Sequence, residues 1–244
     1  MSDVKINYDA GRMAASYERN DLYESDFPNF VKQGSYLCLS DTIIQRYRYC
    51  QKTFDELLKI YAQILSVTHP SQVTPSYIPG DGDWLMGRPT ELYEYRLLSE
   101  NWVYQMRRTI DSLVQLSALH ANQIGELSVK IEPDGIGRLL GKDGNKFSIY
   151  PIFLGSETWL HSDDTDFLGI LNDLFNSMKH CVAHEESHPL FCRECPTVVS
   201  FYSRHNDFRD GYKYHNHNAY HLMMGFQDCV ARVLKNLCIS TDSK

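Results

Sequence analysis

Residues 90–127 read TELYEYRLLSENWVYQMRRTIDSLVQLSALHANQIGEL, and the spacing of their apolar side chains predicts one long helix. Apolar residues recur every three or four positions, which is the period of a helix with one buried face. They are Leu92, Tyr95, Leu98, Trp102, Met106, Ile110, Leu113, Leu116, Leu119 and Ile124. At about 1.5 Å per residue, an unbroken helix of this length would exceed ~50 Å. The length therefore favours a break or bend inside the segment.

Three further segments show the same helical period. In the first of them, Ser40 is a suitable N-cap residue and His69-Pro70 marks the end. A loop from about residue 186 to 216 precedes the last one. The three segments are residues 41–66, 165–185 and 217–238. We therefore predict a mostly α fold, a bundle of four main helices.

The whole chain, residues 1–244, is predicted to form a single helical domain with three irregular parts. Residues 1–39 form a polar N-terminal arm, and residues 69–90 form a long loop that holds four of the nine prolines. Residues 128–154 change character, because short apolar runs flank Asp143-Gly144. Asp-Gly between apolar runs is a strong β-hairpin signal. We therefore predict a small antiparallel β insert over residues 128–154.

The composition is that of a globular protein. Of its 244 residues, 43% are hydrophobic and 23% are charged, and the formal net charge is -7. This charge argues against a generic basic surface that wraps nucleic acid, although it leaves room for a local basic patch. No stretch reaches the ~18–20 apolar residues of a membrane span, and the first residues lack the apolar core of a signal peptide. Because the seven cysteines are an odd number without a secretory signal, we expect reduced thiols in the cytoplasm.

Histidine and cysteine, whose side chains can bind metals or transfer protons, are concentrated in one part of the sequence. Seven of the ten histidines and three of the seven cysteines lie between His180 and His221. Imidazole is the side chain that most readily binds metals and exchanges protons near neutral pH. The crowding fits three interpretations: a ribonuclease-like helical site, a zinc site, or a solvated surface rich in histidine.

Asn176, His180 and His184 lie four residues apart on the third predicted helix, so their side chains stack along one face. Lys179 lies beside them. A cation beside two stacked imidazoles suits contact with a phosphate, because one histidine can move a proton while Lys179 steadies the negative charge that develops. These four residues are therefore the candidate catalytic residues. The alternative is a solvated polar helix face.

The run Lys179-His180-Cys181-Val182-Ala183-His184, the preceding run 171–175 and the helical order resemble the HEPN superfamily of helical bundles. That family includes many prokaryotic RNA-cutting toxins, and its motif is an Arg, a polar residue and then a His a few positions later. Here Lys179 stands where the family has Arg, and Lys cannot form the planar two-pronged contact to phosphate.

The HEPN resemblance implies an RNA-binding or metal-independent RNA-cleaving protein of a prokaryotic defence or toxin system. In the cleaving version, an endoribonuclease, His184 acts as the base on a ribose 2′-hydroxyl, and Lys179 with His180 stabilises the phosphate. That chemistry needs no cofactor. The resemblance also implies a homodimer, because the family's site usually forms at a two-fold interface.

Cys192-Arg193-Glu194-Cys195 has the spacing with which two thiolates grip one metal ion. His188, or His184, would add a third ligand, and a later histidine a fourth. The pattern fits either a zinc site or two unbound thiols. The alternative function, from a different class, is a non-enzymatic helical module, with or without zinc, that works by binding another protein.

Overall fold

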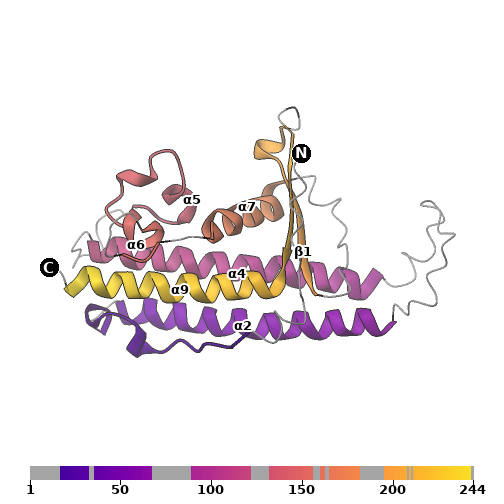
Figure 1. Cartoon of the computed structure of the whole chain (residues 1–244), viewed down its shortest axis with the longest axis horizontal. Helices are drawn as coiled ribbons and strands as arrows, with labels where there is room; N and C mark the ends of the chain where they lie inside the picture. Colours follow the sequence, from indigo (N-terminus) through magenta and orange to yellow (C-terminus); the bar gives the residue numbers. More distant parts are fainter. Residues whose placement is uncertain are drawn as a thin grey trace.

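A computed structural model describes residues 17–32, 36–67, 89–121, 132–155, 160–162, 165–181, 195–207, 209 and 211–242. Within them the chain is mostly helical, and four long helices form the body of the molecule (Figure 1). These helices are α2 (Tyr36–Val67), α4 (Pro89–Ala121), α7 (Phe167–His180) and α9 (Ala219–Asp242). A small antiparallel sheet accompanies them. The predicted fold class, four main helices with a small antiparallel β element, is confirmed.

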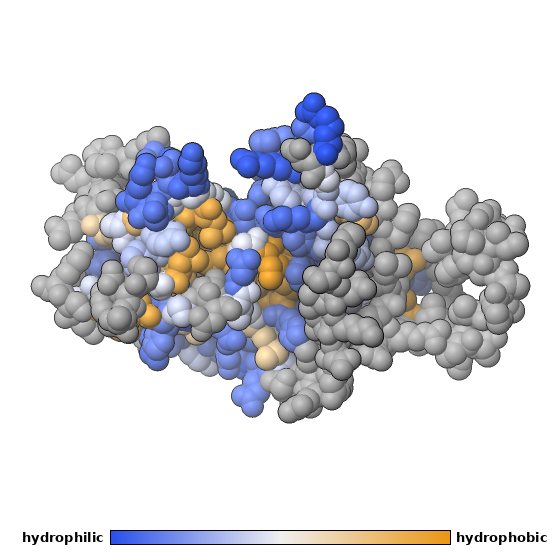
Figure 2. Space-filling model, turned by 45° about the horizontal axis from the view of Figure 1, so that its top comes forward, coloured by the Kyte–Doolittle hydropathy of each residue, from blue (hydrophilic) through white to orange (hydrophobic). Residues whose placement is uncertain are grey.

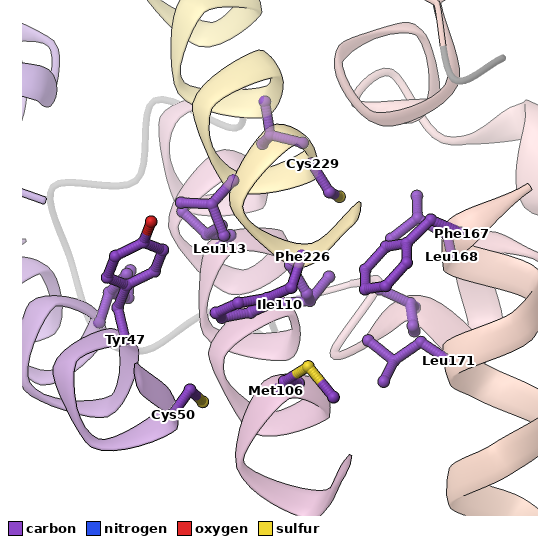
Figure 3. Packing of buried hydrophobic residues seen from close by; sticks show 14 of the residues in the cluster. Tyr47, Cys50, Met106, Ile110, Leu113, Phe167, Leu168, Leu171, Phe226 and Cys229 are labelled. Atoms are coloured by element: carbon purple, nitrogen blue, oxygen red, sulfur yellow. The ribbon is translucent and has the colours of Figure 1, made fainter. Parts of the chain in front are cut away.

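The long helices α2, α4 and α9 run alongside one another, and the shorter α7 covers one side of them (Figure 1). Apolar side chains from all four helices meet in one core, as Figure 3 shows for ten labelled residues. Aromatic rings from different helices stack on one another in this core. Tyr47 of α2 stacks on Phe226 of α9 with ring centroids 5.4 Å apart, and Phe54 stacks on Trp102 at 5.2 Å. Burial of such rings is the main source of stability in a bundle of this size.

The described part of the predicted N-terminal arm lies against α2. It contains two short 3-10 helices, η1 (Glu24–Asp26) and η2 (Asn29–Lys32), and buries Leu22, Phe27 and Val31 in the core. Helix α2 begins at Tyr36, four residues before the expected start at Ser40. Helix α4 continues without interruption over its 33 residues, so the break expected there is absent from residues 89–121. Residues 1–16, 122–127 and most of the loop at 69–90 lie outside the described residues.

The prediction of a β-hairpin at residues 128–154 is wrong for its described part. Residues 132–155 instead form short helical turns: α5 (Ile136–Leu139), η4 (Gly144–Lys146) and α6 (Tyr150–Leu154). The buried residues Ile149, Ile152 and Phe153 have helical spacing. Gly144 is not a hairpin turn residue. It lets the backbone approach Leu139, whose carbonyl oxygen would lie 1.7 Å from a Cβ at this position.

The sheet forms where a loop was predicted. Strands β1 (Thr197–Tyr202) and β2 (Lys213–Asn218) pair antiparallel and stand across the long helices, with the 3-10 turn η5 (Arg204–Asn206) near the tip (Figure 1). Two predicted helix boundaries change as a result. The last helix begins at Ala219 rather than at 217, and α7 ends at His180 rather than at 185. None of the described helices combines the length and apolarity that a membrane span requires.

Candidate functional site

Helix α7 holds three of the four residues that the sequence singled out. Lys179 and His180 are exposed in its last turn, and Asn176 is half-buried one turn earlier. Cys181, which follows, has extended backbone geometry (φ -93°, ψ 118°). The helix therefore ends before position 184, the third of the positions that were predicted to align on one helix face. His184 lies outside the described residues, and its catalytic role stays a prediction.

The tip of the hairpin is attached to this end of α7. The side-chain amide of Asn206 donates a hydrogen bond of 2.9 Å to the carbonyl oxygen of His180, which the ending helix leaves without a helical donor. This contact brings η5, with Arg204 and His205, to the end of α7 that carries Lys179. Figure 2 shows the hairpin tip as one of two hydrophilic elevations on this side of the molecule. The two segments thus carry Lys179 and Arg204 as exposed cations.

The hairpin has two different faces, because side chains alternate along a strand. One face packs on α7: Ser200 and Ser177 share a hydrogen bond between their hydroxyl groups, and Val198 is buried. His215 and His217 of β2 lie opposite Ser200 and Val198, so they belong to the same face. The alternation thus places both imidazoles between the sheet and the helical bundle.

The opposite face carries a cluster of three aromatic rings. The Phe201 ring lies 5.5 Å from the Tyr212 ring and 5.0 Å from the Tyr214 ring, measured between centroids. Tyr212 is 62% exposed and Tyr214 is 44% exposed. Large exposed rings in mutual contact, on an element that projects from the core, are typical of a binding surface.

A line of polar groups runs from α7 into β2 on the packed face. The ammonium of Lys213 lies 2.8 Å from Oδ2 of Asp173, and Nε2 of His215 lies 3.9 Å from the same oxygen. On the other side of its ring, Nδ1 of His215 lies 3.1 Å from Nε2 of His217. The sequence analysis predicted none of these contacts. In the sequence, Asp173 is simply an acidic residue on the polar side of a predicted helix.

Burial keeps these imidazoles uncharged. It lowers the pKa of His217 to about 4, with the neighbouring His215 and His221 acting in the same direction. Burial also lowers the pKa of His215, against the opposing effect of the Asp173 carboxylate. Both histidines are therefore neutral at pH 7, the form in which imidazole accepts a proton.

The structure describes only one of the three predicted zinc ligands, Cys195. Cys192 and His188 lie outside the described residues, and Cys195 is buried directly before β1. Among the described residues, no three His, Cys, Asp or Glu side chains are grouped so that they could hold a metal ion. A zinc site built on Cys192, Cys195 and His188 stays a prediction.

An open groove of about 410 Å³ lies on α9, between Gly225 and Lys235, next to His161 and Thr165. Its polar groups hold neighbouring segments in place. Arg232 donates to the carbonyl oxygen of Phe153, and the Asn236 amide beside the groove donates to Ile152 and His161. The groove is therefore explained by the attachment of α6 to α9.

No protein-family model, curated protein or solved structure that was compared matches this chain. Function is therefore inferred from the side chains that the hairpin and α7 bring together. The polar line on the packed face and the aromatic cluster on the exposed face are the two features that call for a function.

Proposed function

We propose that this protein binds single-stranded RNA on the hairpin β1–β2 and the adjoining end of α7. The observation that carries the proposal is the cluster of Phe201, Tyr212 and Tyr214 on the exposed face. Unpaired bases stack on exposed aromatic rings, and every base has a face that can stack. Two adjacent exposed tyrosines offer a platform for successive bases.

Cations on the hairpin and at the end of α7 supply the contacts that phosphates need. Residues 197–218 contain Arg204, Arg209 and Lys213 against Asp207 and Asp210, a formal charge of +1 in a chain of -7. Lys179 of α7 adds a further cation next to the tip. Arg209 pairs with Asp207, and this contact raises the pKa of Arg209, but both side chains lie at the surface where a phosphate can replace the carboxylate. The hairpin is thus locally cationic on an acidic protein.

The choice of RNA over DNA follows from the resemblance of the α7 motif to the HEPN superfamily and its RNA-cutting members. A single strand is favoured over a duplex because stacking requires unpaired bases. With this ligand, the protein would serve the role that the resemblance implies, in a prokaryotic defence or toxin system.

Removing one stacking ring should weaken RNA binding strongly. A stacked base contributes about 1–3 kcal/mol, so Tyr214→Ala should raise the Kd for a short mixed-sequence RNA by roughly 5- to 150-fold. Fluorescence anisotropy of a labelled RNA measures this change. The matched control is Tyr23→Ala, which removes a 54% exposed tyrosine next to η1, far from the hairpin.

Two results would contradict the proposal. One is equal affinity of the wild type, Tyr214→Ala and Tyr23→Ala proteins for the RNA. The other is an affinity that does not fall as salt rises from ~50 to ~200 mM, because phosphate contacts release counterions and must respond to salt.

A second candidate function is a protein-interaction module that works as a homodimer. The observation that favours it is a row of exposed side chains on one face of α4: Tyr93, Leu97 and Tyr104, which are 60%, 46% and 46% exposed. Their spacing of four and seven residues aligns them along the helix. Aligned exposed apolar side chains are typical of a contact surface.

If this row forms a dimer interface, the wild type should sediment as a dimer and Leu97→Glu as a monomer, because a charge buried in the interface is strongly unfavourable. Analytical ultracentrifugation at several protein concentrations measures the change. A wild type that is monomeric throughout excludes the dimer. RNA affinity should be the same in both proteins, which separates this function from RNA binding.

A further inference from the structure

Two histidines on the packed face of the hairpin direct ring nitrogens at each other. His215 and His217 lie two residues apart on β2, so their side chains leave the strand on the same face. Nδ1 of His215 lies 3.1 Å from Nε2 of His217, and the ring centroids are 5.4 Å apart. Two nitrogens that bind one Zn²⁺ ion tetrahedrally, each at about 2.0–2.1 Å, lie about 3.3 Å apart. The observed separation is therefore close to the one that a shared metal ion requires.

A carboxylate on the far side of the pair favours the tautomer that metal binding needs. Nε2 of His215 is buried without a hydrogen-bond partner among the described residues, and Oδ2 of Asp173 lies 3.9 Å from it, slightly beyond hydrogen-bond distance. A carboxylate only accepts hydrogen bonds, so it favours the imidazole with its proton on Nε2 and its lone pair on Nδ1, facing His217. Histidines that bind metals usually direct their other N–H at such a partner, which fixes the ring and makes the ligand nitrogen more basic.

Both imidazoles are in the protonation state of a ligand at neutral pH. Only the neutral ring offers a lone pair to a metal ion, and burial lowers the pKa of both His215 and His217. Without a metal ion, Nε2 of His217 donates its proton to Nδ1 of His215. When an ion binds, that proton moves through solvent to Nδ1 of His217, so no net proton is released. Protons therefore compete weakly with the metal ion.

We propose that His215 and His217 form a binding site for one divalent transition-metal ion such as Zn²⁺, with Asp173 as the positioning residue of His215. Imidazole nitrogen suits zinc, copper and nickel, whereas Mg²⁺ and Ca²⁺ prefer oxygen ligands. The protein supplies two ligands, because no group of three is present among the described residues. Water fills the other two positions of the tetrahedron.

The pair is open toward the start of α9. His217 is half-buried, and the exposed His221 in the first turn of α9 is close enough to lower the pKa of His217. The ring of His215, by contrast, is buried next to Asp173 of α7. A hydrated ion can therefore reach the two nitrogens from the side of His217 and keep its remaining water on that side.

This site is separate from the two other features of the region. The ligands predicted from the sequence, Cys192, Cys195 and His188, take no part in it. The proposed RNA surface lies on the opposite face of the hairpin, so metal binding does not depend on RNA binding. Tyr214→Ala, which should weaken RNA binding, should leave the affinity for zinc unchanged.

Isothermal titration calorimetry with ZnCl₂ tests the site on the full-length protein, after removal of bound metal by a chelator and dialysis. The wild type should bind one equivalent more than His217→Gln, which lacks a ligand nitrogen. Asp173→Asn should weaken this equivalent by roughly 10- to 100-fold, and Asp173→Glu should restore part of the affinity. The matched control, His161→Gln, replaces an exposed histidine on another side of the bundle and should bind like the wild type. Circular dichroism confirms that each variant is folded.

A second measurement needs no substitution. Long-range ¹H–¹⁵N NMR spectra of the imidazoles, recorded on the wild type with and without ZnCl₂, identify the ring nitrogens that bind the ion. We expect Nδ1 of His215 and Nε2 of His217 to change together. Adventitious binding at the surface would instead change exposed histidines such as His161.

The outcomes separate this site from its alternatives. One equivalent of zinc that is lost in folded His217→Gln and kept in His161→Gln and Cys192→Ser supports the inference. A wild type that binds no zinc overturns it and leaves the proposed RNA binding standing. Equal zinc binding by the wild type and His217→Gln also overturns it, and a loss in Cys192→Ser alone would place the ion at the predicted cysteine site.

Discussion

Replacing Asp111 with Ala is expected to lower the free energy of unfolding by about 3–5 kcal/mol, because it leaves a buried guanidinium without its counter-charge. Nε of Arg107 donates to Oδ1 of Asp111 at 2.9 Å, and its Nη1 donates to Oδ1 of Asn172 on α7 at 2.6 Å. The side chains of Arg107 and Asp111 are only 8% and 12% exposed. Burial lowers the pKa of Arg107, and the Asp111 carboxylate opposes that shift.

Asp111 also holds α5 onto the bundle. The backbone N–H of Ile136 donates to the same Oδ1 at 2.9 Å, and a Cβ on Gly135 would lie 2.6 Å from it. The glycine therefore permits the close approach on which this hydrogen bond depends. Asp111→Ala leaves the N–H of Ile136 unpaired as well, so both losses act in the same direction.

Urea denaturation measures the effect, and α4 itself supplies the matched control. Arg96 and Glu100 form an ion pair with the same spacing of four residues, but their side chains are 20% and 27% exposed. Glu100→Ala should lower the free energy of unfolding by less than about 1 kcal/mol. Equal effects of the two substitutions would show that burial of the Arg107–Asp111 pair does not determine its contribution.

The helical period predicted the fold class because it is a local property that tertiary contacts reinforce. Six of the apolar positions predicted within residues 90–127 are buried in α4, and Leu92, Leu98 and Leu119 are half-buried. Helix ends were less predictable. Helix α7 stops at His180, whose carbonyl oxygen is bonded by Asn206, a residue 26 positions away that no local pattern connects to it.

The predicted β insert was placed at residues 128–154 because the Asp-Gly dipeptide there was given more weight than the strand-like composition of a later segment. Asp143-Gly144 suggested a hairpin, but Ile149, Ile152 and Phe153, which follow it, have helical spacing. Meanwhile TVVSFY at 197–202 is rich in β-branched and aromatic residues and carried a detectable strand signal. Its partner, KYHNHN at 213–218, is polar throughout and has no such signal, so only the pairing reveals it.

The candidate site was predictable as a region but not as a set of residues. The concentration of histidines drew attention to residues 180–221, which contain the hairpin. His217 was expected on the last helix, yet it lies in β2, so its neighbour is His215 and not a residue one helical turn away. Asp173 joins the line through a contact over 40 residues between α7 and β2, which a single sequence cannot show.

The buried state of His217 should make the protein less stable as the pH falls below 6.5. In the unfolded chain this imidazole takes up a proton near pH 6.5, whereas in the folded protein its pKa is about 4. Between these values the unfolded state binds more protons, so acid favours unfolding. A shift of this size corresponds to about 3 kcal/mol of stability that is present above pH 6.5 and lost by pH 4. His215, whose pKa burial also lowers, acts in the same direction.

Carboxylates titrate in the same range, so the measurement compares the wild type with His217→Gln, which has no proton to gain at this position. Urea denaturation at pH 7, 5.5 and 4 should give a steeper loss of stability for the wild type, by about 3 kcal/mol in total. His161→Gln, which removes an exposed histidine, should follow the wild type. Parallel profiles of the wild type and His217→Gln would mean that the imidazole of His217 is accessible enough to be protonated in the folded protein. In that case burial between the sheet and the bundle would not hold this imidazole neutral.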